Sequence, residues 1–427
     1  MKAAGLDLAK YDALIRDLES MCQHRRANPV DKSDEVYYEL LLKHFRRLRD
    51  ARQEGKHIAA FQTPLFASLL HAMDMVPLHL AAVPVSLART QATYEECFSV
   101  ARQLGVGGAE VCSIHRLALG AFMQGLLPHP DLIIGSRPYC DNCAGSCALM
   151  AEIYDIPYFY ADRPYTYSEA AVRYFTQELE ELLGVLEQIT GRRRDPRRLA
   201  EAVGNSKRLI ELRREIFELR KAVPFPMRNR RAMNLEVIDF HWDGCPESVA
   251  YYELVRDELK ERVERGQGFI PKERFRLASI YYPPTWCWRL WDWWEREYGA
   301  VNVWELTSWT PRALEKEMDP ARPLESLARR SFFGCISSDF YYPASIPIQD
   351  TLEAVRDYQV EGVVWYANVG CINSVAWAKL LKDALAEKGI PLLFLDCDYV
   401  DPTYVSEAEL KDKTEAFFEM LGERKGK

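Results

Sequence analysis

Short apolar runs that alternate with helical segments constrain the fold of this chain more than any other feature. Such runs, bounded by turns, are typical of strands buried in a parallel sheet. The first set of runs is Ile58–Phe61, Val76–Val83, Leu132–Gly135 and Tyr158–Tyr160. The second set is Phe275–Ile280, Val301–Leu306, Gly362–Trp365 and Leu392–Leu395. The pattern predicts an α/β protein with two doubly wound parallel-sheet lobes of the Rossmann or flavodoxin type.

Helical periodicity fills the rest of the chain. It dominates residues 1–56, and it continues almost without interruption from Ser168 to about Arg265. We therefore divide the chain into an N-terminal helical segment (1–56), a first lobe (57–167), a helical connector (168–265) and a second lobe (266–427). The sequence shows no internal repeat, although the shared strand–helix pattern suggests that the two lobes are structural relatives.

Charge and hydropathy narrow the classes of partner. The 55 Lys and Arg residues against 63 Asp and Glu residues give a net charge of −8, which argues against nucleic acid as the main partner. The most apolar stretch, Phe66–Ala88, is interrupted by histidines, prolines and Asp74, so we expect no membrane span. With no signal peptide in the sequence, we expect a cytoplasmic location. The arginines between Arg192 and Arg198 are interpreted as a solvated surface, with contact to an anionic ligand as the alternative.

The placement of three cysteines points to chemistry. The chain has 11 cysteines and no export signal, which favours reduced thiols or metal ligands over disulfides. Cys112 begins a predicted helix, Cys140 follows the strand Leu132–Gly135, and Cys371 follows the strand Gly362–Trp365. Ligands collect where parallel strands end, so these thiols would converge if the lobes face each other. Soft sulfur ligands suit an iron–sulfur cluster, zinc or copper(I).

The other cysteines are less informative. Cys143 and Cys147 form a local cluster with Cys140 that resembles part of a ferredoxin motif, but the further cysteines of that motif are missing. We interpret both as packed residues on one helix face, with cluster ligation as the alternative. For Cys335 the sequence favours neither packing nor cluster ligation. The remaining cysteines are interpreted as structural: Cys22, Cys97, Cys245, Cys287 and Cys397.

Several motifs occur in one order over most of the chain. They are Glu110-Val-Cys-Ser, Pro130-Asp-Leu-Ile-Ile with Tyr139-Cys-Asp, Gly370-Cys-Ile-Asn-Ser, and the tail that begins Asp398-Tyr-Val-Asp-Pro. With them the chain resembles the catalytic-component subunits of the benzoyl-CoA reductase and 2-hydroxyacyl-CoA dehydratase family. The tail is especially similar to that of the larger reductase-type subunits.

The resemblance implies a single [4Fe–4S] cluster held by Cys112, Cys140 and Cys371. It also implies an acyl-CoA substrate, a homologous second subunit in a heterodimer or homodimer, and an ATP-hydrolysing iron–sulfur activator that delivers single electrons. The expected activity is ring reduction of a benzoyl-CoA type substrate. The alternatives are dehydration of a 2-hydroxyacyl-CoA and, from another class, a non-catalytic partner or scaffold subunit.

Two departures from the family pattern bear on these alternatives. Many members have a Pro-x-Glu-Leu turn after the first strand, whereas this chain has Gln62-Thr-Pro-Leu-Phe66, without the glutamate. The absence of this glutamate weakens the dehydratase alternative. It is also compatible with a heterodimer in which this chain is the subunit with the smaller catalytic role. A sister branch holds a double-cubane cluster on six cysteines, but here Thr307 or a neighbour stands where another cysteine would be expected. We therefore expect no double cubane.

Polar residues near the predicted ligands are candidates for substrate chemistry. Asn373 and Ser374 follow Cys371, where the start of a helix could stabilise an oxyanion, and simple N-capping is the alternative. Gln62 and Thr63 follow the first strand and could contact substrate or serve only a turn before a proline. His115 lies one helical turn after Cys112 and could relay a proton or be a hydrogen-bonded structural histidine.

Overall fold

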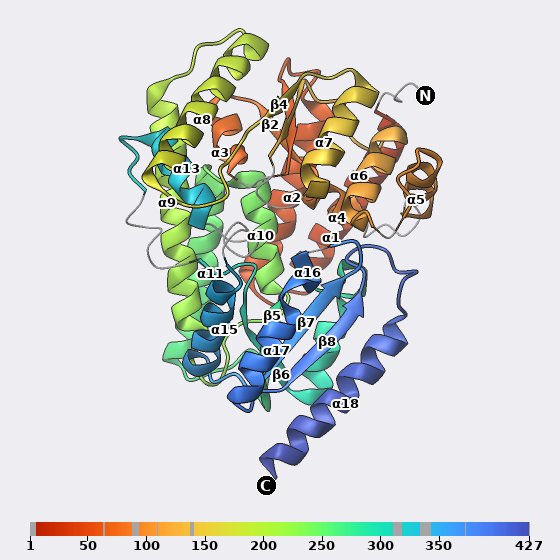
Figure 1. The fold of residues 1–427 in the computed structure, drawn as a ribbon, viewed down its shortest axis with the longest axis vertical. Helices are drawn as coiled ribbons and strands as arrows, with labels where there is room; N and C mark the ends of the chain where they lie inside the picture. Colours follow the sequence, from red (N-terminus) through yellow and green to blue (C-terminus); the bar gives the residue numbers. More distant parts are fainter. Residues whose placement is uncertain are drawn as a thin grey trace.

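The computed structural model describes residues 6–62, 65–87, 94–108, 110–136, 141–310, 318–333, 343–371 and 373–426. Within them lie two four-stranded sheets, each entirely parallel and flanked by helices (Figure 1). The predicted fold class, two doubly wound lobes with helices between and before them, is confirmed.

The first sheet has the strand order β2-β1-β3-β4. Its strands are β1 (Ile58–Phe61), β2 (Val76–His79), β3 (Leu132–Gly135) and β4 (Tyr158–Tyr160). The helices that connect them are α3 (Phe66–Ala72), α4 (Ala82–Leu87), α5 (Tyr94–Gln103), α6 (Ser113–Met123) and α7 (Asp141–Tyr154). The strands β1, β2 and β3 are buried along their whole length because helices cover both faces of the sheet. This burial explains why nearly all their residues are apolar.

The second sheet has the order β6-β5-β7-β8, which repeats the topology of the first sheet strand for strand. Its strands are β5 (Phe275–Ile280), β6 (Ala300–Glu305), β7 (Gly362–Asn368) and β8 (Leu392–Cys397). The helices around it are η2 (Thr285–Cys287), α12 (Arg289–Trp293), η3 (Trp294–Tyr298), α15 (Ser345–Asp357), α16 (Asn373–Ala376), α17 (Ala378–Glu387) and α18 (Glu407–Lys425). The shared strand order supports the view that the lobes are structural relatives.

The strand orders define where ligands are expected. In each sheet the first strand is flanked by the second strand on one side and by the third on the other. The crevice at this switch point opens beyond the carboxyl ends of the two central strands. It therefore lies between the loops after β1 and β3 in the first lobe, and after β5 and β7 in the second.

Long helices hold the lobes together. At the N-terminus they are α1 (Leu8–Ala27) and α2 (Lys32–Asp50), and in the connector α8 (Glu169–Thr190), α9 (Pro196–Leu219), α10 (Arg231–Trp242) and α11 (Pro246–Glu264). Ser168 caps α8 by accepting a bond from the Ala171 amide, and Asp195 caps α9 ahead of a proline at its first turn. In Figure 1, α10 lies between the two lobes.

The two faces of the first sheet pack into different cores. Ile58 and Ala60 face a core shared with α1, α2 and the second sheet, while Ala59 and Phe61 face a core built with α8 and α9. This division follows from the alternation of side chains along a strand.

Helix α13 (Pro323–Phe333) has a position that the sequence pattern does not predict. Although it follows β6 in the chain, it packs against α8, and its Leu327 and Phe332 join the core that contains Phe61. The second lobe thus contributes to the core of the first. The division into segments ending at residues 56, 167 and 265 stays a prediction.

Several predicted strand boundaries differ from the observed ones: β6 begins and ends one residue earlier than predicted, and β7 and β8 extend to Asn368 and Cys397. The strand expected at Val76–Val83 ends at His79, and α4 begins at Ala82. The His79 Nδ1 atom accepts bonds from the amides of Ala81 and Ala82, and α4 begins at the second of these residues. None of the described helices combines the length and hydropathy needed to cross a bilayer.

Candidate functional site

Two of the three predicted ligand cysteines lie at the starts of helices. Cys112 is the N-cap of α6, and Cys371 lies in the turn between β7 and α16. Cys140 lies outside the described residues, but α7 begins at the next residue, Asp141. Cys112 and Cys371 are partly exposed, whereas most other described cysteines, including Cys143 and Cys147, are buried. Cys112 and Cys371 are therefore partly accessible to solvent, unlike the buried cysteines.

One side chain brings the three cysteine-bearing segments together. The Asn142 Nδ2 atom donates to the carbonyl oxygen of Gly370 at 3.2 Å and to that of Glu110 at 3.5 Å, the second at the limit of a hydrogen bond. Asn142 stands two residues after Cys140, Glu110 stands two before Cys112, and Gly370 directly precedes Cys371. We call this meeting of loops the inter-lobe junction, because Gly370 belongs to the second lobe and the other two residues to the first.

The donor set at the inter-lobe junction fits an iron–sulfur cluster on chemical grounds. Three soft thiols from three separate loops match the ligands that such clusters take. Among the described residues, no three histidine, cysteine or acidic side chains stand close enough to hold a metal ion by themselves.

The Cys371 loop is held by buried hydrogen bonds. The fully buried Ser374 hydroxyl lies 2.8 Å from the carbonyl oxygen of Cys371 and 3.0 Å from that of Asn368. The indole Nε1 of Trp365 donates to the Ser374 carbonyl at 2.6 Å. Because a hydroxyl has a single hydrogen to donate, Ser374 is committed to fixing this loop.

Tyr281 supports the same loop from β5. It follows the strand directly, is buried, and has a φ of 62°, a left-handed conformation that costs free energy in a residue with a side chain. Its hydroxyl donates to the Asn373 carbonyl at 2.6 Å and accepts from the Trp377 indole at 2.9 Å. Asn373, a predicted oxyanion contact, thus begins the short helix α16 and is anchored through its backbone.

The Cys112 loop is held by charges from the second lobe. The Arg116 Nε atom donates to the Val111 carbonyl at 3.1 Å, and its Nη2 atom lies 3.7 Å from carboxylate oxygens of Asp398 and Asp401, beyond β8. Burial raises the pKa of Asp398, although the backbone amides of Val400 and Asp401, which donate to its Oδ1 atom at 2.9 and 2.7 Å, act in the opposite direction. Both lobes therefore position the start of α6.

Gln62 and His115, predicted separately, meet in one polar cluster. The Gln62 Nε2 atom lies 3.0 Å from the His115 Nδ1 atom, and the Ser146 hydroxyl lies 3.0 Å from the same nitrogen. Gln62 and His115 are both buried, at the carboxyl end of β1. Thr63 lies outside the described residues.

Sequence reasoning missed three residues that shape the site, Asn142, Ser146 and Arg116, which act through contacts over long sequence separations. A local signal for Asn142 was its position two residues after a singled-out cysteine. Asp398 was noted as part of the tail motif, but its contact with Arg116 was not predicted.

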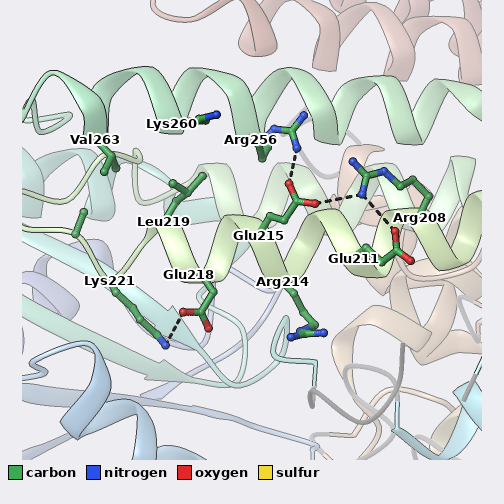
Figure 2. Close-up of a pocket in the computed structure, with 11 residues that line it drawn as sticks. Arg208, Glu211, Arg214, Glu215, Glu218, Leu219, Lys221, Arg256, Lys260 and Val263 are labelled. Atoms are coloured by element: carbon green, nitrogen blue, oxygen red, sulfur yellow. Dashed lines mark hydrogen bonds and ion pairs between the residues drawn. The ribbon is translucent and has the colours of Figure 1, made fainter. Parts of the chain in front are cut away.

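The groove of about 880 Å³ between α9 and α11 lies apart from the inter-lobe junction (Figure 2). Its charges largely satisfy one another: Arg208 and Arg256 share Glu215, and Lys221 binds Glu218 at 2.8 Å. Since none of its lining residues follows a sheet strand, we do not assign it to the candidate site.

The family model for the 2-hydroxyglutaryl-CoA dehydratase D-component matches residues 67–421. The chain belongs to this family. The match spans α3 to α18 and includes all three predicted ligand cysteines, so the resemblance recognised from the motifs is confirmed.

The curated relatives are named either as subunits of a benzoyl-CoA reductase or as subunits of 2-hydroxyacyl-CoA dehydratases. A benzoyl-CoA reductase subunit of Thauera aromatica is 25% identical over 342 residues, which cover 74% of this chain and 78% of the relative. The (R)-2-hydroxyisocaproyl-CoA dehydratase alpha subunit of Clostridioides difficile is 20% identical over 404 residues, 91% of this chain and 96% of the relative. The (R)-phenyllactyl-CoA dehydratase alpha subunit of Clostridium sporogenes is 22% identical over 338 residues, 74% and 78% respectively. The family is thus one of enzyme subunits, either oxidoreductase or lyase.

Proposed function

We propose that this chain is the iron–sulfur subunit of an acyl-CoA-transforming enzyme that works by low-potential single-electron transfer. The observation that carries the proposal is the pair of contacts from Asn142 to Gly370 and Glu110, which joins the segments of all three candidate ligands. Cys112, Cys140 and Cys371 would hold a [4Fe–4S] cluster with one iron free of protein thiolate. When bound, such a cluster would supply single electrons at low potential.

The surrounding residues provide a rigid setting for this chemistry. Ser374 and Tyr281 fix the Cys371 loop, and Arg116 fixes the Cys112 loop. Thiolate sulfurs that accept few hydrogen bonds favour a low reduction potential.

The substrate needs polar contacts as it gains charge. A thioester carbonyl, or an aromatic ring conjugated to one, becomes anionic when it accepts an electron. We assign Gln62, together with Thr63, to contact the substrate at the carboxyl end of β1, and His115 to orient Gln62 or to hold a proton. Asn373 is the corresponding candidate beside Cys371.

Two reactions fit this assignment. Ring reduction of a benzoyl-CoA type substrate is favoured by the 25% identity to a benzoyl-CoA reductase subunit and by the tail after Asp398. Dehydration of a 2-hydroxyacyl-CoA is favoured by the (R)-2-hydroxyisocaproyl-CoA dehydratase subunit, which aligns over 91% of this chain and 96% of its own length. For either reaction we propose a homologous second subunit and an ATP-hydrolysing iron–sulfur activator.

The test is turnover of defined substrates by the anaerobically purified chain together with its second subunit and activator. Benzoyl-CoA and a 2-hydroxyacyl-CoA would be compared with ATP and a dithionite-level reductant. Consumption of benzoyl-CoA alone supports the ring reductase, and dehydration alone supports the second reaction. Turnover of neither ester contradicts the proposed function.

A further inference from the structure

A groove of about 810 Å³ opens beside the Cys112 loop, and none of the roles above uses it. Its walls come from α1, α2 and α5, which belong to the N-terminal segment and the first lobe, and from α10, η2 and the turn after β8. Both lobes therefore contribute to the groove. Its volume lies in the range of sites that bind small molecules.

One wall of the groove stands against the candidate site. Phe98 and Asp401 line the groove. The Arg116 guanidinium lies 5.0 Å from the centroid of the Phe98 ring, and its Nη2 atom lies 3.7 Å from a carboxylate oxygen of Asp401. Arg116 in turn binds the carbonyl of Val111, the residue before Cys112. Only a few side chains therefore separate the groove from the Cys112 loop.

A second, narrow cavity adjoins the groove and leads toward the carboxyl edge of the first sheet. Asn234 and Trp288 line both spaces, and the narrow cavity is also lined by Ala81 and Ala82, which follow β2. Because β1 and β2 pair in parallel, Gln62 at the end of β1 lies at the same edge. The cavity has about 30 Å³, enough for a water molecule, so a longer group passes only when the side chains at its mouth rotate.

Flat aromatic side chains line the groove. Trp286 and Trp288 are partly exposed, and Tyr38 faces the groove from α2. The indole Nε1 of Trp286 donates to the Asp398 carbonyl at 3.1 Å, which fixes the plane of this ring. Exposed rings of this kind stack with the bases of nucleotides.

Two arginines of the groove have no anionic partner among the described residues. Arg25 and Arg289 form no ion pair with any described carboxylate, whereas Arg230 binds Asp292 at 3.0 Å. Guanidinium groups bind phosphates through a planar fork of N–H groups. Arg25 and Arg289 are therefore available to a phosphorylated ligand.

Two of the three carboxylates that line the groove have partners of their own. Asp401 accepts bonds from the amide and the hydroxyl of Thr403 at 3.0 and 2.6 Å, and Glu407 pairs with Lys411 at 2.6 Å. The third, Glu95, is exposed on α5. The unpaired charge of the groove is therefore positive, which suits an anion.

We propose that this groove binds the nucleotide end of the acyl-CoA substrate. The inference rests on the proposed function and adds the place of the CoA moiety. The adenine stacks on Trp286 or Trp288, and the phosphates bind Arg25 and Arg289. The pantetheine arm passes Asn234, whose amide can bond to the amides of the arm, and carries the thioester to the carboxyl edge of the first sheet.

The test is calorimetric titration of the anaerobically purified chain, alone and with its second subunit, with three probes. Acetyl-CoA has the nucleotide and the arm, S-acetylpantetheine lacks the nucleotide, and ATP lacks the arm. The variants are Arg25→Gln and Arg289→Gln. Arg193→Gln is the matched control, because Arg193 is also exposed and forms no ion pair with a described carboxylate, but lies between α8 and α9. Circular dichroism verifies that each variant is folded.

We expect wild type to bind acetyl-CoA about 10-fold more tightly than either S-acetylpantetheine or ATP. Arg25→Gln and Arg289→Gln should each weaken acetyl-CoA binding by about 10-fold and leave S-acetylpantetheine binding unchanged. Arg193→Gln should bind all three probes like wild type. An acetyl-CoA with a photoreactive azido group on the adenine should label the peptide that carries Trp286 and Trp288.

Asn234→Phe tests the direction of the arm. The larger side chain should narrow the mouth of the inner cavity and weaken acetyl-CoA binding. Adenosine 3′,5′-bisphosphate, which has no arm, should bind this variant like wild type. Unchanged acetyl-CoA binding in Asn234→Phe would contradict the path past this residue.

Three results would overturn the assignment of the groove while leaving the proposed function intact. They are acetyl-CoA binding in both arginine variants equal to that of wild type, ATP binding as tight as that of acetyl-CoA, and photolabelling confined to other peptides. If wild type binds no acetyl-CoA in either form, the acyl-CoA substrate itself is wrong, and the proposed function fails with the groove.

Discussion

The side-chain amide of Asn142 donates to the carbonyl oxygen of Gly370 at 3.2 Å, across the boundary between the two lobes. This contact lies one residue from Cys371 and two from Cys140. Hydrogen bonds of this kind specify geometry more than they add stability. The amide of Asn142 therefore links two candidate ligand loops directly.

Replacing Asn142 by alanine should loosen the ligand loops. The variant loses its bonds to Gly370 and Glu110, so we expect less iron per chain and a loss of about 1–2 kcal/mol in the free energy of unfolding. Asn205→Ala is the control, because its amide donates to the Gly244 carbonyl at 3.0 Å, outside the inter-lobe junction. Iron analysis and urea unfolding of both variants check the prediction. Equal iron loss in the two variants would show that Asn142 has no special role.

Ser374 offers a second test of loop positioning. Its hydroxyl donates to the Cys371 carbonyl at 2.8 Å, and the Ser248 hydroxyl makes the same three-residue contact to the Cys245 carbonyl at 2.8 Å. Ser374→Ala and Ser248→Ala should each cost about 1 kcal/mol of unfolding free energy. Only Ser374→Ala should release iron faster to a chelator. The role assigned to Ser374 is wrong if the two variants release iron at the same rate.

Four of the eight histidines form a group between α2, the first lobe and α10: His44, His79 and His241 are buried, and His71 is partly buried. The rings of His44 and His241 stack with centroids 4.0 Å apart, and the His71 Nε2 atom lies 2.9 Å from the His241 carbonyl oxygen. Burial lowers the pKa of His71 to about 4 and that of His79 to about 3, and it lowers the pKa values of His44 and His241 far below the ordinary value.

These histidines should make the fold sensitive to mild acid. Their folded pKa values lie below the unfolded value of about 6.5, so protons bind the unfolded chain preferentially as the pH falls below about 6.5. Each histidine then costs up to about 1.4 kcal/mol per pH unit. Glu236 and Glu295, with folded pKa values of about 7, act in the opposite direction and offset part of the loss.

A single variant isolates the histidine contribution. His44→Phe keeps an aromatic ring against His241 but cannot be protonated. Relative to wild type, its free energy of unfolding should improve by about 1.4 kcal/mol per pH unit between about pH 6.5 and about pH 5. Urea unfolding at about pH 8, 6 and 5 measures the difference. A difference between the two proteins that stays constant over this range contradicts this explanation.

Four strands were predicted with their observed bounds, because short apolar or aromatic runs between turns leave few alternatives. They are Ile58–Phe61, Leu132–Gly135, Tyr158–Tyr160 and Phe275–Ile280. The run after Val76 was misread because α4 is as buried and apolar as β2, and hydropathy alone does not mark the change at His79. The strand β7 extends three residues beyond the predicted Trp365 because Tyr366, Ala367 and Asn368 pair with β8.

The candidate site was predicted as separate residues and not as an arrangement. Gln62 and His115 were both singled out, yet their contact joins residues 53 positions apart and has no local signal. The same holds for Glu236, whose hydroxyl partners Thr307 and Ser308 lie 71 and 72 positions away in the chain. Which loops meet depends on how the two sheets are oriented, and periodicity within each segment does not encode that.

Iron and sulfide analysis of the anaerobically purified chain, combined with EPR after reduction, tests the central claim most directly. Wild type and Cys287→Ala, which alters a buried thiol beside α12, should each contain about four irons per chain and give a cluster signal. Cys371→Ala and Cys112→Ala should be strongly depleted of iron while retaining a folded α/β spectrum by circular dichroism. A wild-type chain without iron, or equal iron in Cys371→Ala and Cys287→Ala, would contradict the assignment of the cluster to these loops.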